Sequence, residues 1–202
     1  MRVILCSASS RRRDILNTAG IKHEIIVSDC EEIITSLSPS DVVCELSCQK
    51  AKAVYDKADI IPDSCEDILF IGSDTVVALE GEIFGKPKNT EDAKVMLGKL
   101  SGKVHQVYTG VTLIYLLKNT DKSQCKINTF YEKTDVCVAS LSEEEIADYV
   151  ASGEPMDKAG AYGIQGLFSK YILSITGEYN NVVGFPIARF IQEIKRYRQK
   201  CQ

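Results

Sequence analysis

"ILFIGSDTVVALEGEIF", residues 68–84, contains two apolar runs, 68–73 and 75–79, that meet at Asp74. Their length and their Val and Ile content predict strands, with Asp74 at the end of the first one. The continuation "LEGEIF" places Glu80 and Gly81 between two strand-like runs, which is the pattern of a β-hairpin. Because a hairpin joins antiparallel strands, we expect a mixed sheet rather than a purely parallel one.

Strand-like and helical patterns alternate on both sides of this stretch. Further apolar runs predict strands at 2–6, 23–28, 107–117 and 134–141, and the polar segment 118–126 predicts an exposed loop. Periodicity and capping residues predict helices from Ser9 or Ser10 to Gly20 and at 39–58, 90–100 (with Thr90 as N-cap), 142–153 and 186–200. The alternation predicts an α/β fold.

The composition is that of an ordinary globular protein. The chain has 202 residues, 45% hydrophobic and 26% charged, which predicts one domain, of one or two lobes, with a sizeable core. Its formal net charge of −4 argues against a protein that binds nucleic acid mainly through counterion release. We therefore expect the local basic clusters to serve a small partner.

The distribution of apolar residues and cysteines indicates a cytoplasmic protein. The apolar run after Arg2 is too short for a signal peptide, and no stretch approaches a membrane span. The eight cysteines include no CxxC pair, and only two histidines could join them as metal ligands. We expect reduced thiols and no membrane contact.

An arginine cluster lies in the stretch "CSASSRRRDIL", residues 6–16, where Arg11, Arg12 and Arg13 fall in the first turn of the predicted helix. Cations at that end oppose the helix dipole, at a cost of about 0.3–1 kcal/mol each. A bound anion would reverse the sign, since helix N-termini with nearby arginines bind phosphate. A phosphate site and a solvated basic turn are both open on this stretch alone.

Two groups of acids are candidates for chemistry. Asp74 follows a strand almost free of polar residues, and Glu31 and Glu32 follow the predicted strand 23–28. Carboxylates at two strand ends can hold a hard divalent cation and orient a water molecule. For Asp74 alone, a simple turn residue is the more common interpretation.

Basic and glycine-rich segments supply further candidates. Lys86 precedes Pro87, which favours extended backbone, whereas Lys50 is by default a solvated helix lysine. The loop "MDKAGAYGIQG", residues 156–166, is neither a dinucleotide fingerprint nor a P-loop. Its Gln165 carries the donor and acceptor that read a base edge, although on this stretch alone a polar residue that caps a tight loop is the favoured interpretation. We interpret His105 as structural.

Six motifs in order, "SASSRRRDIL", "GSDTVV", "GKP", "MLGKLSGKVHQVYTGV", "YVASGEPMDKAGAYGIQG" and "GEYNNVVGFP", resemble the Maf family of nucleoside triphosphate pyrophosphatases. The resemblance covers nearly the whole chain, residues 1–202, as a single Maf-like domain. It implies a long, twisted mixed sheet flanked by helices, with two lobes around a nucleotide cleft, similar to inosine triphosphate pyrophosphatases. It also implies hydrolysis between the α and β phosphates, which yields a nucleoside monophosphate and pyrophosphate and requires Mg²⁺, Mn²⁺ or Co²⁺.

The matching motifs imply roles for individual residues. Asp74 takes the position of the general base, and Glu32 and Asp74 those of the metal ligands. The substrate-binding positions match Ser7, Arg11, Arg12, Glu32, Lys50, Thr75, Lys86 and Gln165. The form "AGAYGIQG" resembles the branch that acts on dTTP and UTP. Ser10 replaces the proline common in this motif, and the extra Arg13 leaves open which arginines contact phosphate.

Other functions stay open beside hydrolysis of dTTP and UTP. One is a nucleotide-binding regulator of cell division with little turnover, and another is a pyrophosphatase for modified nucleotides such as 7-methyl-GTP. A carboxylate beside polyphosphate favours an enzyme, because it would repel a ligand that it merely bound unless a metal intervened. We expect no nucleic-acid partner, and a homodimer is compatible with the sequence.

Overall fold

The computed structural model describes residues 1–57 and 66–200, which form two compact units. Unit 1 comprises Met1–Asp74, Thr109–Tyr131 and Gly184–Gln202, and unit 2 comprises Thr75–Tyr108 and Glu132–Val183. Three strands continue from one unit into the other, so neither unit is a single stretch of chain. That the two units are lobes of one domain stays a prediction.

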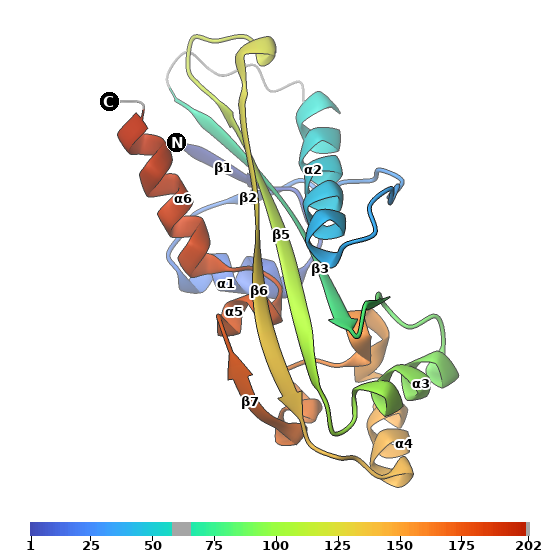
Figure 1. Cartoon of the computed structure of the whole chain (residues 1–202). Coiled ribbons are helices and arrows are strands. Elements are labelled where there is room, and N and C mark those ends of the chain that lie inside the picture. The colour runs from blue at the N-terminus through green and yellow to red at the C-terminus, as the bar shows by residue number, and fades with distance from the viewer. Residues whose placement is uncertain (58–65, 201–202) are drawn as a thin grey trace. The chain divides into compact units, whose positions relative to one another are not determined.

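Seven strands of the described residues form one sheet (Figure 1). Their order is β2 (Glu24–Ile25), β1 (Arg2–Leu5), β3 (Ile68–Leu79), β5 (Val104–Leu116), β6 (Lys126–Val138) and β7 (Ile172–Thr176), with β4 (Glu82–Phe84) paired to β3. β1 runs parallel to β2 and β3, whereas β3 with β4 and β6 with β7 are antiparallel. The predicted mixed α/β fold is confirmed.

In unit 1, helices lie on both faces of the strands. The helices are α1 (Ser10–Thr18), α2 (Pro39–Lys57) and α6 (Ile187–Lys200). Ile114 belongs to a core cluster with Val54 of α2, whereas the next residue, Tyr115, stacks on Tyr197 of α6 with ring centroids 3.6 Å apart. Since successive side chains of a strand point to opposite faces, α2 and α6 cover opposite sides of β5.

Close contact between α2 and the sheet depends on two glycines. A Cβ on Gly72 of β3 would lie 2.2 Å from the Ser47 carbonyl oxygen, and one on Gly110 of β5 would lie 2.2 Å from the Val43 carbonyl oxygen. No side chain fits between these backbones. The helix therefore rests directly on two strands, and its position relative to them is fixed.

Unit 2 is built around its own core. The predicted hairpin is confirmed, because Glu80 (φ 53°) and Gly81 (φ 85°) form the two-residue turn between β3 and β4. Helices α3 (Thr90–Leu100) and α4 (Glu143–Ala151) pack on a cluster that includes Leu97 and Phe168. The remaining elements are α5 (Tyr179–Val183) and the 3₁₀ turns η1 (Lys122–Gln124, in unit 1), η2 (Glu154–Asp157), η3 (Ala159–Ala161) and η4 (Leu167–Tyr171).

Several sequence-based expectations need correction. Asp74 lies inside β3 rather than at a strand end, because the strand extends from Ile68 through the polar pair Asp74 and Thr75 to Leu79. β2 ends at Ile25, so Glu31 and Glu32 do not directly follow a strand. Asn89, not Thr90, caps α3.

The later strands also differ from the sequence prediction. β6 begins at Lys126, well before the predicted 134, and β7 was not predicted. β7 has exposed residues at three of its five positions, one of them Leu173, so it lacks the alternation of buried apolar and exposed polar residues that predicts a strand. Ala58, the predicted last residue of the second helix, lies outside the described residues.

The described cysteines are Cys6, Cys30, Cys44, Cys48, Cys125 and Cys137, and all are free thiols. Cys65 and Cys201 lie outside the described residues. Within the described part of the chain, no helix is both long enough and apolar enough to cross a membrane. The cytoplasmic location and the homodimer stay predictions.

Candidate active site

Helix α1 in unit 1 begins as its sequence predicts. The side chain of Ser9 accepts a hydrogen bond from the backbone N–H of Arg12, which selects Ser9 over Ser10 as the N-cap. The first turn contains no acidic residue. Arg11 is half-buried, Arg12 is buried, and Arg13 is exposed with its Nε 3.4 Å from Asp14 Oδ1. The three arginines thus have different environments.

Arg12 is built into the fold. Its Nε donates to the Gly184 carbonyl oxygen at 2.9 Å, and its Nη1 donates to Ser7 Oγ at 3.1 Å. Burial lowers the pKa of Arg12, and the negative charges of Asp74 and Glu32 act in the opposite direction. The guanidinium therefore lies within the field of two predicted site carboxylates.

Lys50 links those two carboxylates. Its Nζ lies 2.5 Å from Asp74 Oδ1 and 2.8 Å from Glu32 Oε1. Gly72 and Asp74 share a face of β3 because they are two residues apart, and Gly72 is where α2 touches the strand. Lys50 lies within one helical turn of Ser47 at that contact. The glycine contact thereby brings the Lys50 ammonium to the Asp74 carboxylate.

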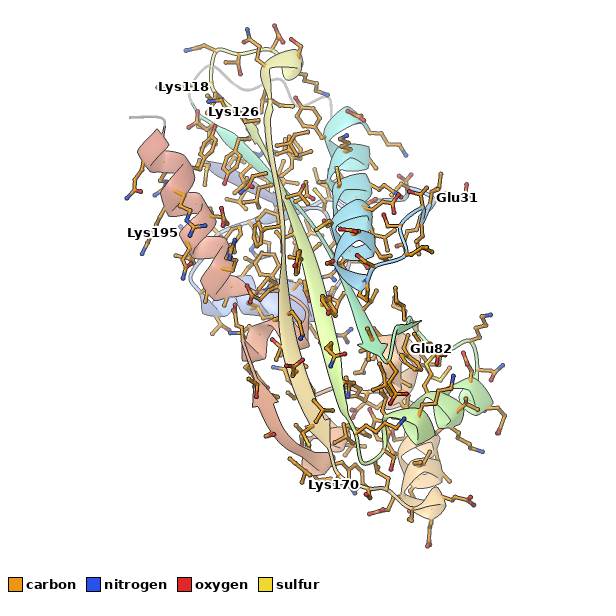
Figure 2. The ribbon with its side chains drawn as sticks, in the orientation of Figure 1. Glu31, Glu82, Lys118, Lys126, Lys170 and Lys195 are labelled. Atoms are coloured by element: carbon orange, nitrogen blue, oxygen red, sulfur yellow. The ribbon has the colours of Figure 1, made fainter. Side chains whose placement is uncertain are left out.

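Glu32 reaches this cluster from the segment 26–38, which lies between β2 and α2 and forms no strand. The side chain of Gln49 accepts from the Ile33 N–H and donates to the Ile33 carbonyl, and Glu45 accepts from Thr35 and Ser36. These bonds hold the segment to the helix on the carboxyl-terminal side of Glu32. Figure 2 shows Glu31 on the outer side of the segment.

The cluster fits a hard divalent cation. Carboxylates of Asp74 and Glu32 converge on one Nζ, so a cation at a similar position would meet two oxygen ligands. Mg²⁺ is commonly bound by one or two carboxylates, with water and substrate phosphate completing its shell. The described residues contain no group of three or more His, Cys, Asp and Glu side chains that could hold a metal by themselves.

The other predicted site residues belong to unit 2. Thr75 is half-buried in β3, and Lys86 and Gln165 are exposed in loops. The Gly160 N–H donates to the Gly85 carbonyl at 3.0 Å, which joins the loop of Lys86 to the glycine-rich loop 156–166. Thus unit 2 brings these two loops together.

His105 is fully buried in unit 2, and its Nε2 lies 2.7 Å from the Tyr162 hydroxyl oxygen. Burial lowers the pKa of His105 to about 4, against a smaller opposite effect of Asp135. A neutral imidazole that joins β5 to the glycine-rich loop agrees with its interpretation as a structural residue.

Two residues of unit 2 that the sequence patterns do not single out also contact this loop. Glu154 accepts a hydrogen bond from the Leu167 N–H, and Tyr149 accepts one from the Gly163 N–H. The available signal was the position of Glu154 just before the glycine-rich run, but a lone acid there is compatible with many roles.

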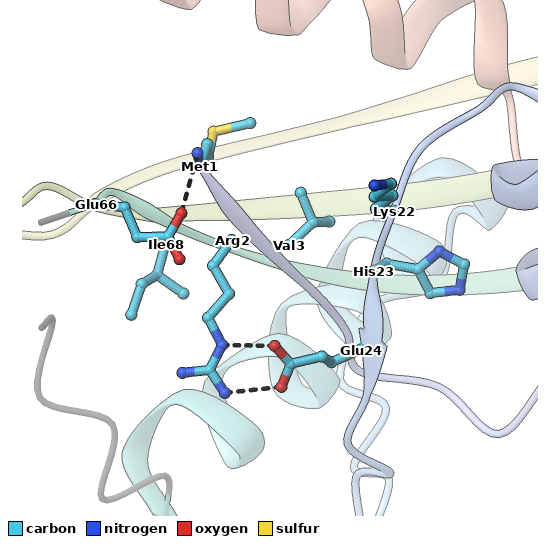
Figure 3. A pocket seen from close by; sticks show the side chains of 8 residues that line it. All are labelled: Met1, Arg2, Val3, Lys22, His23, Glu24, Glu66 and Ile68. Carbon is cyan, nitrogen blue, oxygen red and sulfur yellow. Dashed lines mark hydrogen bonds and ion pairs between the residues drawn. The ribbon is translucent and has the colours of Figure 1, made fainter.

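A hollow of about 510 Å³ near the N-terminus lies apart from the predicted residues (Figure 3). Arg2 Nε lies 2.7 Å from Glu24, and the terminal amine of Met1 lies 3.2 Å from Glu66. None of the predicted site residues lines this hollow. Arg2 and the terminal amine already have carboxylate partners, so the hollow is a poor candidate for a polyphosphate site.

Together, the fold and unit 1 define a mixed α/β protein in which an arginine-bearing helix N-terminus lies near a lysine between two carboxylates. The chain belongs to the Maf family, since the family model described as "Maf-like protein" matches residues 2–197.

Its relatives include two bacterial proteins named "dTTP/UTP pyrophosphatase". The protein of Agathobacter rectalis is 50% identical over 201 residues, which cover 96% of this chain and 97% of that protein. The protein of Lachnoclostridium phytofermentans is 46% identical, over 97% of this chain and 95% of the relative. Among solved structures, the Ham1 protein of Staphylococcus aureus matches with a TM-score of 0.42 and 14% identity, over 85% of this chain and 80% of that one.

Proposed function

We propose that this chain is a nucleoside triphosphate pyrophosphatase that prefers dTTP and UTP. The bond cleaved lies between the α and β phosphates, so the products are a nucleoside monophosphate and pyrophosphate. The observation that carries the chemistry is Lys50 Nζ within 2.8 Å of both Asp74 and Glu32. The names of relatives at 46–50% identity over nearly full length support the choice of substrate.

We assign phosphate binding to the arginines of unit 1. Arg11 is half-buried in the first turn of α1, where the helix dipole adds to its charge in attracting an anion. Arg12 holds Ser7 and the Gly184 backbone in place and adds positive charge. We assign direct phosphate contact to Arg11 first, because it is half-buried in the first turn of α1, whereas Arg12 is buried.

Asp74 and Glu32 are the residues that would hold a divalent cation. Bound there, the cation would neutralise phosphate charge and activate a water molecule. Lys50 keeps the two carboxylates together without the cation and is placed to pair with phosphate when the cation binds.

In the hydrolytic step, a water oxygen forms a bond to the α-phosphorus while the bond from that phosphorus to the bridging oxygen breaks. Pyrophosphate leaves with the electron pair, and Asp74 accepts the proton of the water. The arginines and Lys86 stabilise the charge that develops. Metal ligation by Asp74 is a second role for the same carboxylate.

Selection of the base is assigned to unit 2. Gln165 offers one donor and one acceptor, which match the carbonyl and N–H along one edge of uracil or thymine. Thr75 is the other residue assigned to the base. A site that accepts both dTTP and UTP makes only weak contacts with the ribose 2′-hydroxyl and the thymine methyl group, which are the groups that differ between the two nucleotides.

The test is pyrophosphate release from a panel of nucleoside triphosphates with Mg²⁺ or Mn²⁺. We expect kcat/KM for UTP and dTTP to exceed that for GTP and ATP by at least about tenfold, the range that a few hydrogen bonds supply. Binding of all substrates without turnover would instead favour the nucleotide-binding regulator. A preference for 7-methyl-GTP would overturn the substrate assignment and leave the chemistry of Asp74 intact.

A further inference from the structure

The loop that carries Gln165 in unit 2 is tied down at both ends. At one end, the Gly163 N–H donates to the Tyr149 hydroxyl at 3.3 Å. At the other end, the Leu167 N–H donates to Glu154 Oε2 at 2.8 Å. The two anchors are joined, because the Tyr149 hydroxyl donates to Glu154 Oε1 at 3.0 Å.

The backbone of the loop also lies directly against the Glu154 carboxylate. A Cβ on Gly166 would lie 2.2 Å from Glu154 Oε1, and one on Gly163 would lie 2.7 Å from Lys158 Cε. Lys158 in turn donates to the Glu154 carbonyl at 2.7 Å. The glycines on either side of Gln165 thus leave room for the side chains of Glu154 and Lys158.

The rest of the structure supports this arrangement. Tyr149 is 4% exposed, and the centroids of its ring and the Phe168 ring are 5.0 Å apart in the core of unit 2. Burial and the bond to Glu154 raise the pKa of Tyr149, so its hydroxyl stays protonated and keeps donating to the carboxylate. Gln165, between the two anchored ends, is exposed.

We propose that Glu154, with Tyr149, is a positioning residue that fixes the loop of Gln165 and thereby sets the selectivity for the base. The inference rests on the proposed function and on the assignment of Gln165 to the base. Glu154 acts through the loop backbone and contacts neither the base nor the phosphates. A loop released at one end would sample several positions, so the amide of Gln165 would meet its partner less often.

The experiment compares kcat and KM for UTP and GTP in wild type and Glu154→Ala. Glu154→Ala is expected to raise KM for UTP about tenfold while kcat/KM for GTP changes less than about twofold, because only the preferred base uses the loop. Glu154→Gln retains an oxygen acceptor for the Leu167 N–H and is expected to restore most of the preference. Glu144→Ala, at an exposed position of α4, is the matched control and should behave as wild type.

A double-mutant cycle separates positioning from general stability. If Glu154 acts through Gln165, Glu154→Ala should cost little further selectivity in a Gln165→Ala background. Equal losses on UTP and GTP, or full additivity with Gln165→Ala, would overturn the inference. If Glu154→Ala does not fold, Tyr149→Phe, which removes both the acceptor for the Gly163 N–H and the donor to Glu154, must reduce the UTP preference, and an unchanged preference would also overturn the inference.

The same assays keep the two proposals apart. Turnover by wild type with an unchanged UTP to GTP ratio in the variants contradicts only the positioning role. Absence of turnover by wild type on every nucleotide contradicts the proposed function itself.

Discussion

Asp74 is the residue on which the proposed chemistry depends most. Its side chain is 14% exposed, and Lys50 neutralises part of its charge at 2.5 Å. We expect Asp74→Asn to abolish hydrolysis and to leave nucleotide binding within a few-fold, because the amide keeps the shape but accepts no proton at neutral pH. Pyrophosphate release and equilibrium binding of UTP measure the two effects. Activity retained by Asp74→Asn would assign the base elsewhere.

Truncation of Arg12 should mainly lower stability, and truncation of Arg11 should mainly lower activity. Arg12→Ala leaves the Gly184 carbonyl and Ser7 hydroxyl without this donor and is expected to lower the free energy of unfolding by about 2–4 kcal/mol. Arg11→Ala is expected to cost less stability than Arg12→Ala, because Arg11 is only half-buried, and to raise the activation free energy for kcat/KM by about 2–4 kcal/mol. Denaturant titrations and steady-state kinetics separate the outcomes, and the reverse pattern would exchange the two assignments.

His105 should make stability depend on pH in a window set by its burial. Its pKa is about 4 in the folded chain and about 6.5 when exposed in the unfolded one. Between these values the unfolded chain binds more protons, so the free energy of unfolding falls as the pH falls. The contribution is fully present above pH 6.5.

From pH 6.5 to 5 this loss amounts to about 1.6 kcal/mol. Urea unfolding of wild type and His105→Gln at several pH values measures it, since the variant lacks the titrating group. The same slope in both proteins between pH 6.5 and 5 would show that other groups dominate.

At the scale of elements, the contact of α2 with β3 and β5 decides where Lys50 lies. Gly72→Ala would place a methyl group 2.2 Å from the Ser47 carbonyl oxygen and 2.7 Å from the Ala51 nitrogen. Both neighbours are helix backbone atoms that cannot move without moving α2. The geometry of the Lys50, Asp74 and Glu32 cluster is therefore coupled to this one glycine.

We expect Gly72→Ala to lower the free energy of unfolding by about 3 kcal/mol or more, as overpacking against backbone does. Gly98→Ala is the control, because Gly98 lies in α3 and, apart from its chain neighbours and the backbone of its own helix, nothing lies within 4 Å of the added methyl group. It should raise stability by about 0.5–1 kcal/mol. Thermal unfolding of both variants checks the pair, and tolerance of Gly72→Ala would argue against the close contact.

At the scale of the whole molecule, the proposed ligand should stabilise the fold through a metal. A non-hydrolysable UTP analogue with Mg²⁺, at 100 times its Kd, is expected to raise the free energy of unfolding by about 2.7 kcal/mol. Addition of EDTA should remove most of this gain, because the carboxylates of Asp74 and Glu32 then repel the phosphates. Thermal shift with and without EDTA is the measurement, and a gain insensitive to EDTA would contradict a metal held at these residues.

The sequence by itself determined the mixed α/β class, because the signals for it are local. The turn at Glu80 and Gly81, the N-cap Ser9 and the capping box that begins at Ser142 each involve residues a few positions apart. Such short-range preferences act the same way in any fold. The six ordered motifs determined the family in the same manner, residue by residue along the chain.

Only the tertiary structure decided which side chains meet. Lys50 and Asp74 are 24 positions apart, and no local rule distinguishes Lys50 from a solvated helix lysine. Their contact depends on Gly72 admitting the α2 backbone, and the burial of Arg12 depends on a carbonyl 172 positions away. Likewise, β3 continues through Asp74 because its neighbours in the sheet, rather than its own apolar pattern, supply its hydrogen bonds.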